Sequence, residues 1–306
     1  MKSGTLTLFT GKTEDAYHRL LRRGERAELV RQILSRKAGV YTKNAALKKL
    51  IANRLGWVDV ATWSKRHLRG IESFGQQAIR DGIREVVLMG MGGSSLCPDL
   101  FRRVHKKHPR LTGFHVIDST DPAAIRGLTR RLNLKKTLFI VASKSGGTTE
   151  TRSHEAFFIE QLRAAGVKHF GRHFAAITDK GSALERFARR HRYRKVFINP
   201  SDIGGRYSAL SYFGLVPGYF AGVDLRALLD DAVAMQKLLL ERDGETNPGL
   251  ALGVFLAAAT KAGRDKLTFV ASRKTAPLVP WIEQLLAEST GKMGKGIIPI
   301  EGEPPG

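Results

Sequence analysis

Five short apolar runs, each followed by a polar loop and a helical pattern, constrain the fold of this chain more than any other feature. The runs begin near residues 86, 115, 138, 174 and 196. A run without polar interruption, such as 138–141, is typical of a strand that is buried on both faces of a parallel sheet. Parallel strands need crossover connections, and the helical patterns between the runs supply them. The sequence therefore predicts an α/β fold with a doubly wound parallel sheet.

The rest of the chain is organised around this sheet. Residues 1–82 show apolar side chains at three- and four-residue spacing, which predicts a helical lead-in. Residues 83–222 hold the five runs and form the first domain, and residues 223–263 predict linker helices. Residues 264–306 begin a second strand and helix unit, with a sixth strand predicted at 267–271. One or two strands cannot bury both faces of a sheet, so we expect this second α/β domain to be incomplete.

Composition excludes several classes of protein. The 306 residues suffice for about two domains, and the 42% of hydrophobic residues indicates a globular chain rather than a disordered one. No signal peptide or long apolar run is present, so we expect neither secretion nor a membrane span. The single cysteine, Cys97, excludes an internal disulfide and fits a cytoplasmic location. No paired histidine supports a catalytic thiol, so we interpret Cys97 as a packed residue.

The net charge of +23 favours anionic ligands. The basic residues are spread along the chain, as on solvated helix faces, and form no stripe with interleaved aromatic residues. We therefore expect no specific nucleic-acid binding, although a basic nucleic-acid-associated protein stays an alternative that salt-dependent DNA binding would support. No pair of histidines has metal-ligand spacing with a carboxylate, so we predict no metal.

A polar loop follows the third apolar run. Open parallel sheets bind ligands at the carboxyl ends of their strands, where this loop is predicted to lie. It contains Ser143, Lys144, Ser145 and Thr148, and a helix is predicted from Glu150 to Ala165. Hydroxyls, an ammonium group and free N–H groups at a helix N-terminus form a site for an anion such as phosphate. The alternative is a solvated turn.

Two glycine-rich loops follow other strands. The segment GMGGSS departs from the dinucleotide fingerprint, because the position of its third glycine holds Ser95, and this disfavours a nicotinamide cofactor. After the fifth run, Gly204 and Gly205 permit close approach of the backbone, and Arg206 is placed to reach the same crevice. A capping turn with a surface arginine is the alternative interpretation.

Four segments together resemble the glucose-6-phosphate isomerase family, in the family's order. They are GMGGSSL (90–96), SKSGGTTET (143–151), GGRYSALSYFGL (204–215) and QLLAESTGK (284–292). The residues of these motifs are most similar to the isomerase half of fused bacterial transaldolase and glucose-6-phosphate isomerase proteins. The similarity extends from about Trp57 onward. It implies a flavodoxin-like three-layer sandwich (the sugar isomerase or SIS domain), a cytoplasmic homodimer, and interconversion of glucose 6-phosphate and fructose 6-phosphate without a cofactor.

The resemblance also implies roles for individual residues. In the family a serine and threonine loop holds the phosphate, and a glycine-serine pair lines the sugar site. The matching residues here are Ser143, Ser145 and Thr148 with Lys144 nearby, and Gly93 with Ser94.

The resemblance places the chemistry on two residues. Arg206 matches the arginine that stabilises an enediolate, Glu288 matches the base that moves a proton between C1 and C2, and Gln284 matches a glutamine at the site. Isomerising an aldose removes a proton next to a carbonyl, which a positioned carboxylate can do. A fixed guanidinium then meets the negative charge that develops on the sugar oxygens.

One departure from the family is clear. The family also uses a histidine and a lysine downstream of the ESTGK motif, whereas all nine histidines here precede Glu288. We therefore expect the chain to be a truncated or split form that contains the first SIS domain, the linker helices and the start of the second. A non-catalytic module that binds sugar phosphates is the alternative function.

Overall fold

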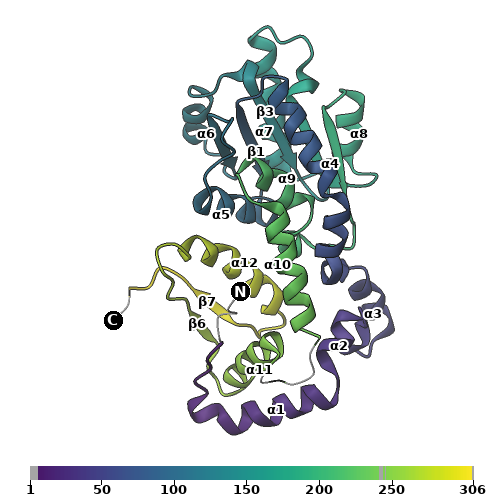
Figure 1. The fold of residues 1–306 in the computed structure, drawn as a ribbon, viewed down its shortest axis with the longest axis vertical. Helices are drawn as coiled ribbons and strands as arrows, with labels where there is room; N and C mark the ends of the chain where they lie inside the picture. The colour runs from purple at the N-terminus through teal and green to yellow at the C-terminus, as the bar shows by residue number, and fades with distance from the viewer. Residues whose placement is uncertain (1–5, 241–243, 245, 305–306) are drawn as a thin grey trace.

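The structure, a computed structural model, describes residues 6–240, 244 and 246–304 (Figure 1). Its larger sheet has five strands: β1 (Glu85–Gly90), β2 (Gly113–Ile117), β3 (Thr137–Ala142), β4 (Phe174–Asp179) and β5 (Lys195–Asn199). All neighbouring strands are parallel, and their order is β2-β1-β3-β4-β5. This is the flavodoxin-like order of doubly wound sheets. The predicted α/β fold is confirmed.

Helices cover both faces of this sheet. One face packs against α4 (Val60–Arg80), α5 (Leu96–Val104), α9 (Tyr212–Phe220) and α10 (Leu225–Leu238). The other packs against α6 (Pro122–Thr129), α7 (Thr149–Ala164) and α8 (Ala183–Arg190). Successive side chains of a strand point to opposite faces, so Val86 and Leu88 join the first core and Val87 and Met89 the second. Burial on both faces explains why these runs lack polar residues.

Cys97 lies in the core between α5 and the sheet. Its side chain is 3% exposed, and burial raises the pKa of its thiol to about 12. A thiol that stays protonated is a poor nucleophile. The interpretation of Cys97 as a packed residue is confirmed.

The N-terminal region is helical, as predicted. It contains α1 (Glu14–Arg26), α2 (Leu29–Leu34) and α3 (Ala45–Ala52). α1 packs against α11 (Pro248–Lys261) in the lower part of Figure 1, with Tyr17 and Leu21 buried against Leu250 and Val254. Asn247 caps α11 by accepting a hydrogen bond from the Leu250 N–H, and Pro248 occupies the first turn, where no N–H is needed. Within this lead-in, α1 therefore packs on α11, whereas α4 packs on the large sheet.

A second, two-stranded parallel sheet pairs β6 (Lys266–Thr268) with β7 (Ile298–Ile300), and α12 (Val279–Thr290) lies between them in sequence. The sixth strand is shorter than the predicted 267–271, because its partner has only three residues to pair with. Short 3-10 turns complete the structure at Gly11–Thr13, Ala38–Val40, Gly56–Asp59, Gly92–Ser94, Leu134–Lys136, Phe170–His173, Gly205–Tyr207 and Ala276–Leu278. None of the described helices is long and apolar enough to cross a membrane. The domain boundaries stay a prediction.

Candidate active site

Two glycine turns meet at the carboxyl edge of the large sheet. They are η4 (Gly92–Ser94), which follows β1, and η7 (Gly205–Tyr207), which follows β5. A Cβ on Gly93 would lie 2.3 Å from the carbonyl oxygen of Gly205, and a Cβ on Gly92 would lie 2.7 Å from Nε2 of Gln284 on α12. Side chains at these positions would push the turns apart. The glycines therefore allow two loops and α12 to converge.

Arg206, Gln284 and Glu288 come together at this convergence. Nη1 of Arg206 donates to Oε2 of Glu288 at 2.5 Å, and Nε2 of Gln284 donates to Oε1 at 3.0 Å. Gln284 and Glu288 lie one helical turn apart on α12, so their side chains share a face. Nε of Arg206 is buried without a hydrogen-bond partner among the described residues. Both carboxylate oxygens are thus held in place, and the Nε–H of Arg206 is left to donate.

Three contacts at this site were not predicted. The hydroxyl groups of Tyr207 and Ser289 lie 2.9 Å apart, and the ring of Trp57 stacks on Tyr207 with centroids 5.4 Å apart. Nζ of Lys292 also donates to the backbone oxygen of Glu288 at 2.8 Å. Tyr207 and Ser289 each directly follow a predicted site residue, and that adjacency is the signal that could have identified them. These contacts brace η7 against α12.

The serine and threonine loop lies at the start of α7. Oγ of Ser143 is 2.9 Å from Oγ1 of Thr148 and accepts the Gly146 N–H at 3.1 Å, and Ser143 is buried. Ser145 is exposed and accepts the Gly147 N–H at 3.2 Å. Thr148 is the N-cap residue of α7, yet its side chain makes no capping bond. N–H groups of the first helical turn and the hydroxyls therefore remain available to an anion.

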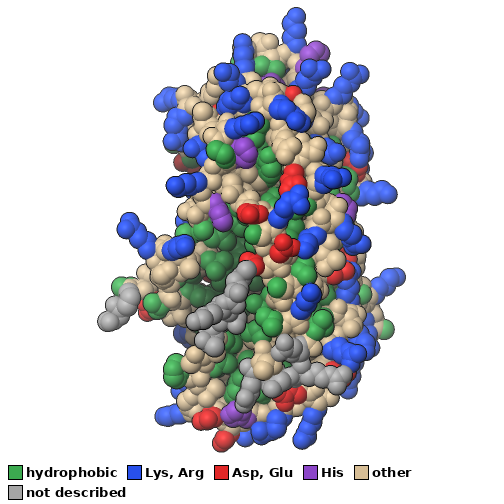
Figure 2. All heavy atoms as spheres, in the orientation of Figure 1, with side chains coloured by type: hydrophobic (Ala, Val, Ile, Leu, Met, Phe, Trp, Pro, Cys, Tyr) green, Lys and Arg blue, Asp and Glu red, His purple; other side chains and the backbone are tan. Residues whose placement is uncertain are grey.

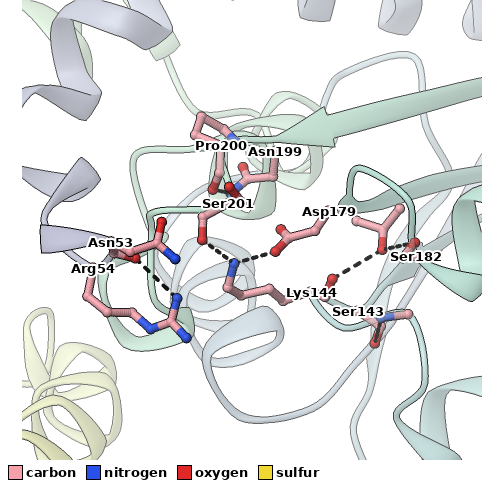
Figure 3. A network of polar contacts seen from close by, with 11 residues as sticks. Asn53, Arg54, Ser143, Lys144, Asp179, Ser182, Asn199, Pro200 and Ser201 are labelled. Atoms are coloured by element: carbon pink, nitrogen blue, oxygen red, sulfur yellow. Dashed lines mark hydrogen bonds and ion pairs between the residues drawn. The ribbon is translucent and has the colours of Figure 1, made fainter. Parts of the chain in front are cut away.

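Lys144 points toward the neighbouring strands. Its Nζ donates to Oδ2 of Asp179 at 2.5 Å and to the backbone oxygen of Ser201 at 2.8 Å (Figure 3). Asp179 ends β4, and Ser201 follows β5. The ammonium group thus ties the loop to the ends of two strands, and its charge is compensated by a carboxylate. The hydroxyls and N–H groups are the parts of the loop left to meet a ligand.

The loop and the Arg206–Glu288 pair occupy the same edge of the sheet. The register of β1 and β3 pairs Gly90 with Ala142, so η4 and the loop that begins at Ser143 are neighbours. Ser94 is half-buried in η4. Within residues 6–240, 244 and 246–304, no group of three or more His, Cys, Asp or Glu side chains could hold a metal ion. The edge thus presents a hydroxyl-rich loop beside a carboxylate and a guanidinium.

One known protein family matches most of this chain. The family model described as phosphoglucose isomerase matches residues 64–296. The chain belongs to the phosphoglucose isomerase family. The match includes η4, the loop that begins at Ser143, η7 and α12. Every predicted site residue therefore lies inside the matched residues.

Curated members of the family are longer than this chain. The glucose-6-phosphate isomerase of Thermus thermophilus is 34% identical over 258 residues, which are 82% of this chain and 60% of that protein. The glucose-6-phosphate isomerase of Gloeothece citriformis is 33% identical over 240 residues, 74% of this chain and 44% of that protein. The crystal structure of a hypothetical protein from Thermus thermophilus matches with a TM-score of 0.78 at 30% sequence identity. The match covers 95% of this chain and 68% of the chain in that structure. The chain spans about half the length of the curated relatives it matches.

The contact between the two glycine turns can be tested through stability. We expect Gly93→Ala to lower the free energy of unfolding by about 1–3 kcal/mol, because the new Cβ would overlap a backbone oxygen that cannot rotate away. The measurement is urea unfolding followed by circular dichroism. Gly70→Ala on α4 is the matched control, since a Cβ there meets nothing within 4 Å, and it should stabilise the helix slightly. Equal effects of the two substitutions would contradict the close approach.

Proposed function

We propose that this chain supplies the catalytic base and the phosphate site for interconversion of glucose 6-phosphate and fructose 6-phosphate. The observation that supports it most is the ion pair of Arg206 with Glu288, which lies beside a hydroxyl-rich helix N-terminus. The names of the curated relatives support the same substrates.

The reaction moves one proton between neighbouring carbons and a second proton between the two oxygens that these carbons carry. In this mechanism the Glu288 carboxylate removes the proton from the carbon next to the carbonyl of the open-chain sugar and returns it to the adjacent carbon. The pair of electrons left behind forms an enediolate. Arg206 lies against the same carboxylate, so its guanidinium is placed to stabilise the negative oxygens. Gln284 keeps the carboxylate oriented through its bond to Oε1.

The phosphate does not react, but its binding orients the sugar. Ser145, Thr148 and the first N–H groups of α7 would hold it by hydrogen bonds and by the positive end of the helix dipole. Gly93 and Ser94 would line the sugar between this loop and the base. Holding the reacting carbons near a positioned base supplies much of the rate enhancement.

Three further points belong to this proposal. A cytoplasmic homodimer and a relation to transaldolase fusions follow from the family resemblance. A sugar-phosphate-binding module without catalysis is the second candidate function, because the hydroxyls and N–H groups of the loop at Ser143 could bind a phosphate without the base.

The test is formation of glucose 6-phosphate from fructose 6-phosphate by the purified chain in a coupled assay. We expect product at a rate proportional to protein concentration, and none from fructose, which lacks the phosphate. Thr148→Ala should raise KM by roughly tenfold, because a hydroxyl donor to a charged group is lost. If the folded chain binds fructose 6-phosphate without turnover, the proposed catalytic function is wrong and the binding module is the function that fits.

A further inference from the structure

A cavity lies at the end of the large sheet opposite the candidate active site. Its volume is about 460 Å³, and it is formed where α4 and α9 end and the segment before β2 begins. β1 and β2 both start at this edge, where Glu85 pairs with Gly113. The polar side chains that line the cavity are Gln76, Arg80, His108, Arg110 and Tyr219. None of them belongs to the candidate active site.

The aromatic wall of this cavity is tightly built. The ring of Tyr219 lies against α4 at Gly75, where a Cβ would come within 2.1 Å of it. The ring of His108 stacks on Tyr219, with centroids 5.4 Å apart and an interplanar angle of 26°. The backbone N–H of His108 donates to the oxygen of Phe220 at 3.0 Å. The wall is therefore held by α4 and α9 and does not depend on a ligand.

The positive charge of the cavity is only partly compensated. Arg80 and Arg110 are exposed, and the hydrogen bond that Arg80 donates goes to the neutral amide oxygen of Gln77, at 3.1 Å. The carboxylate that acts on Tyr219 is Glu72, which is paired with Arg226 at 2.6 Å. Burial and Glu72 raise the pKa of the Tyr219 hydroxyl, whereas Arg110 and Arg80 lower it, so both guanidinium groups act on the same side chain. Arg80 also lowers the pKa of Asp81, but that carboxylate is paired with Arg194, so the acidic groups near the cavity are shared with other cations.

His108 adds a neutral donor. Its Nδ1 accepts the backbone N–H of Arg110 at 3.3 Å, so the neutral ring carries its proton on Nε2. Burial, followed by the charge of Arg110, lowers the pKa of His108 and favours this neutral form. Nε2 has no hydrogen-bond partner among the described residues, which leaves its proton free to meet an acceptor.

We propose that this cavity binds a small phosphorylated metabolite, with a phosphate or diphosphate group held by Arg80, Arg110 and His108. Arginine is suited to phosphate because its planar fork donates two parallel hydrogen bonds. The volume falls within the usual range of small-molecule sites, about 300–1,000 Å³. Lys and Arg side chains crowd the upper end of the molecule, where α4 ends, and would attract anions to it (Figure 2).

The test is calorimetric titration of the whole chain with pyrophosphate and with ADP at physiological salt. The same titrations of Thr148→Ala, which loses a hydroxyl of the loop at Ser143, identify any heat that comes from that loop. The double variant R80Q/R110Q removes the two guanidinium groups, and both side chains are exposed, so the fold should persist. The matched control R22Q/R190Q removes two exposed charges elsewhere.

We expect at least one probe to bind the unsubstituted chain and the affinity to fall by at least roughly tenfold in R80Q/R110Q. The control should bind like the unsubstituted chain. Tighter binding of ADP than of pyrophosphate would show that the aromatic wall also contacts the attached group, and equal binding would assign the affinity to the phosphates. No binding of either probe, or equal loss in R80Q/R110Q and in the control, would overturn the proposal. The outcome is independent of catalysis, because the readout is heat and not turnover.

Discussion

Glu288→Gln should lower kcat for fructose 6-phosphate by roughly 10³-fold, because an amide cannot accept a proton from carbon at neutral pH. The side chain keeps its shape and can still accept a hydrogen bond from Arg206, so KM should change little. A fall in kcat with an unchanged KM marks an interaction made in the transition state. Steady-state kinetics of the coupled assay separate the two constants.

Glu283→Gln provides the matched control on the same helix. Glu283 makes no ion pair among the described residues and is not one of the residues that meet at η7. It should leave kcat unchanged. Retained activity in Glu288→Gln, or an equal loss in the two variants, would remove Glu288 from the role of base. If both proteins still bind fructose 6-phosphate, the loss cannot be assigned to misfolding.

Arg152→Met should lower the free energy of unfolding by about 3 kcal/mol, because it leaves a buried carboxylate without its cation. Glu155 on α7 is 1% exposed, pairs with Arg152 and accepts a hydrogen bond from the Tyr193 hydroxyl at 2.6 Å. The Arg152 guanidinium lies over the Phe187 ring with Cζ 4.6 Å from the centroid, and methionine replaces that contact with an uncharged chain of similar length. Urea unfolding at neutral pH measures the loss.

The loss should depend on pH with a definite sign. Burial raises the pKa of Glu155, while the Tyr193 hydrogen bond and Arg152 oppose that rise. A carboxyl whose folded pKa is raised favours the native state at low pH, and this stability is lost as pH rises through the folded pKa. Without Arg152 the folded pKa rises further. The loss of unfolding free energy caused by Arg152→Met should therefore become smaller when the pH is lowered from about 8 to about 5.

Arg163→Met is the control for this pair. Arg163 and Glu160 are also three residues apart on α7, but their side chains are 52% and 66% exposed. An exposed ion pair contributes about 0–1 kcal/mol, so this substitution should cost little at any pH. Equal destabilisation by the two substitutions would show that burial of Glu155 does not determine the energy.

Much of the fold could be predicted because burial leaves a local trace in the sequence. The run Leu138–Val141 has no polar residue since β3 lies in the middle of the sheet with both faces covered. β6 was predicted too long, because an apolar run does not reveal how many residues its partner strand offers. α11 was predicted as a linker helix, and its pairing with α1 could not be read from either segment.

Local patterns in the chain specify its elements and chemical groups: five strands with crossover helices, a hydroxyl-rich loop before a helix, a guanidinium after two glycines and a carboxylate on a helix. Which of these groups meet depends on tertiary packing. It places Gly93 against Gly205, joins Arg206 to Glu288 across 82 residues, and directs Lys144 to Asp179. These two kinds of interaction act over different distances along the chain. Apolar periodicity and capping act within a few residues, whereas strand order and the approach of loops depend on how distant surfaces pack.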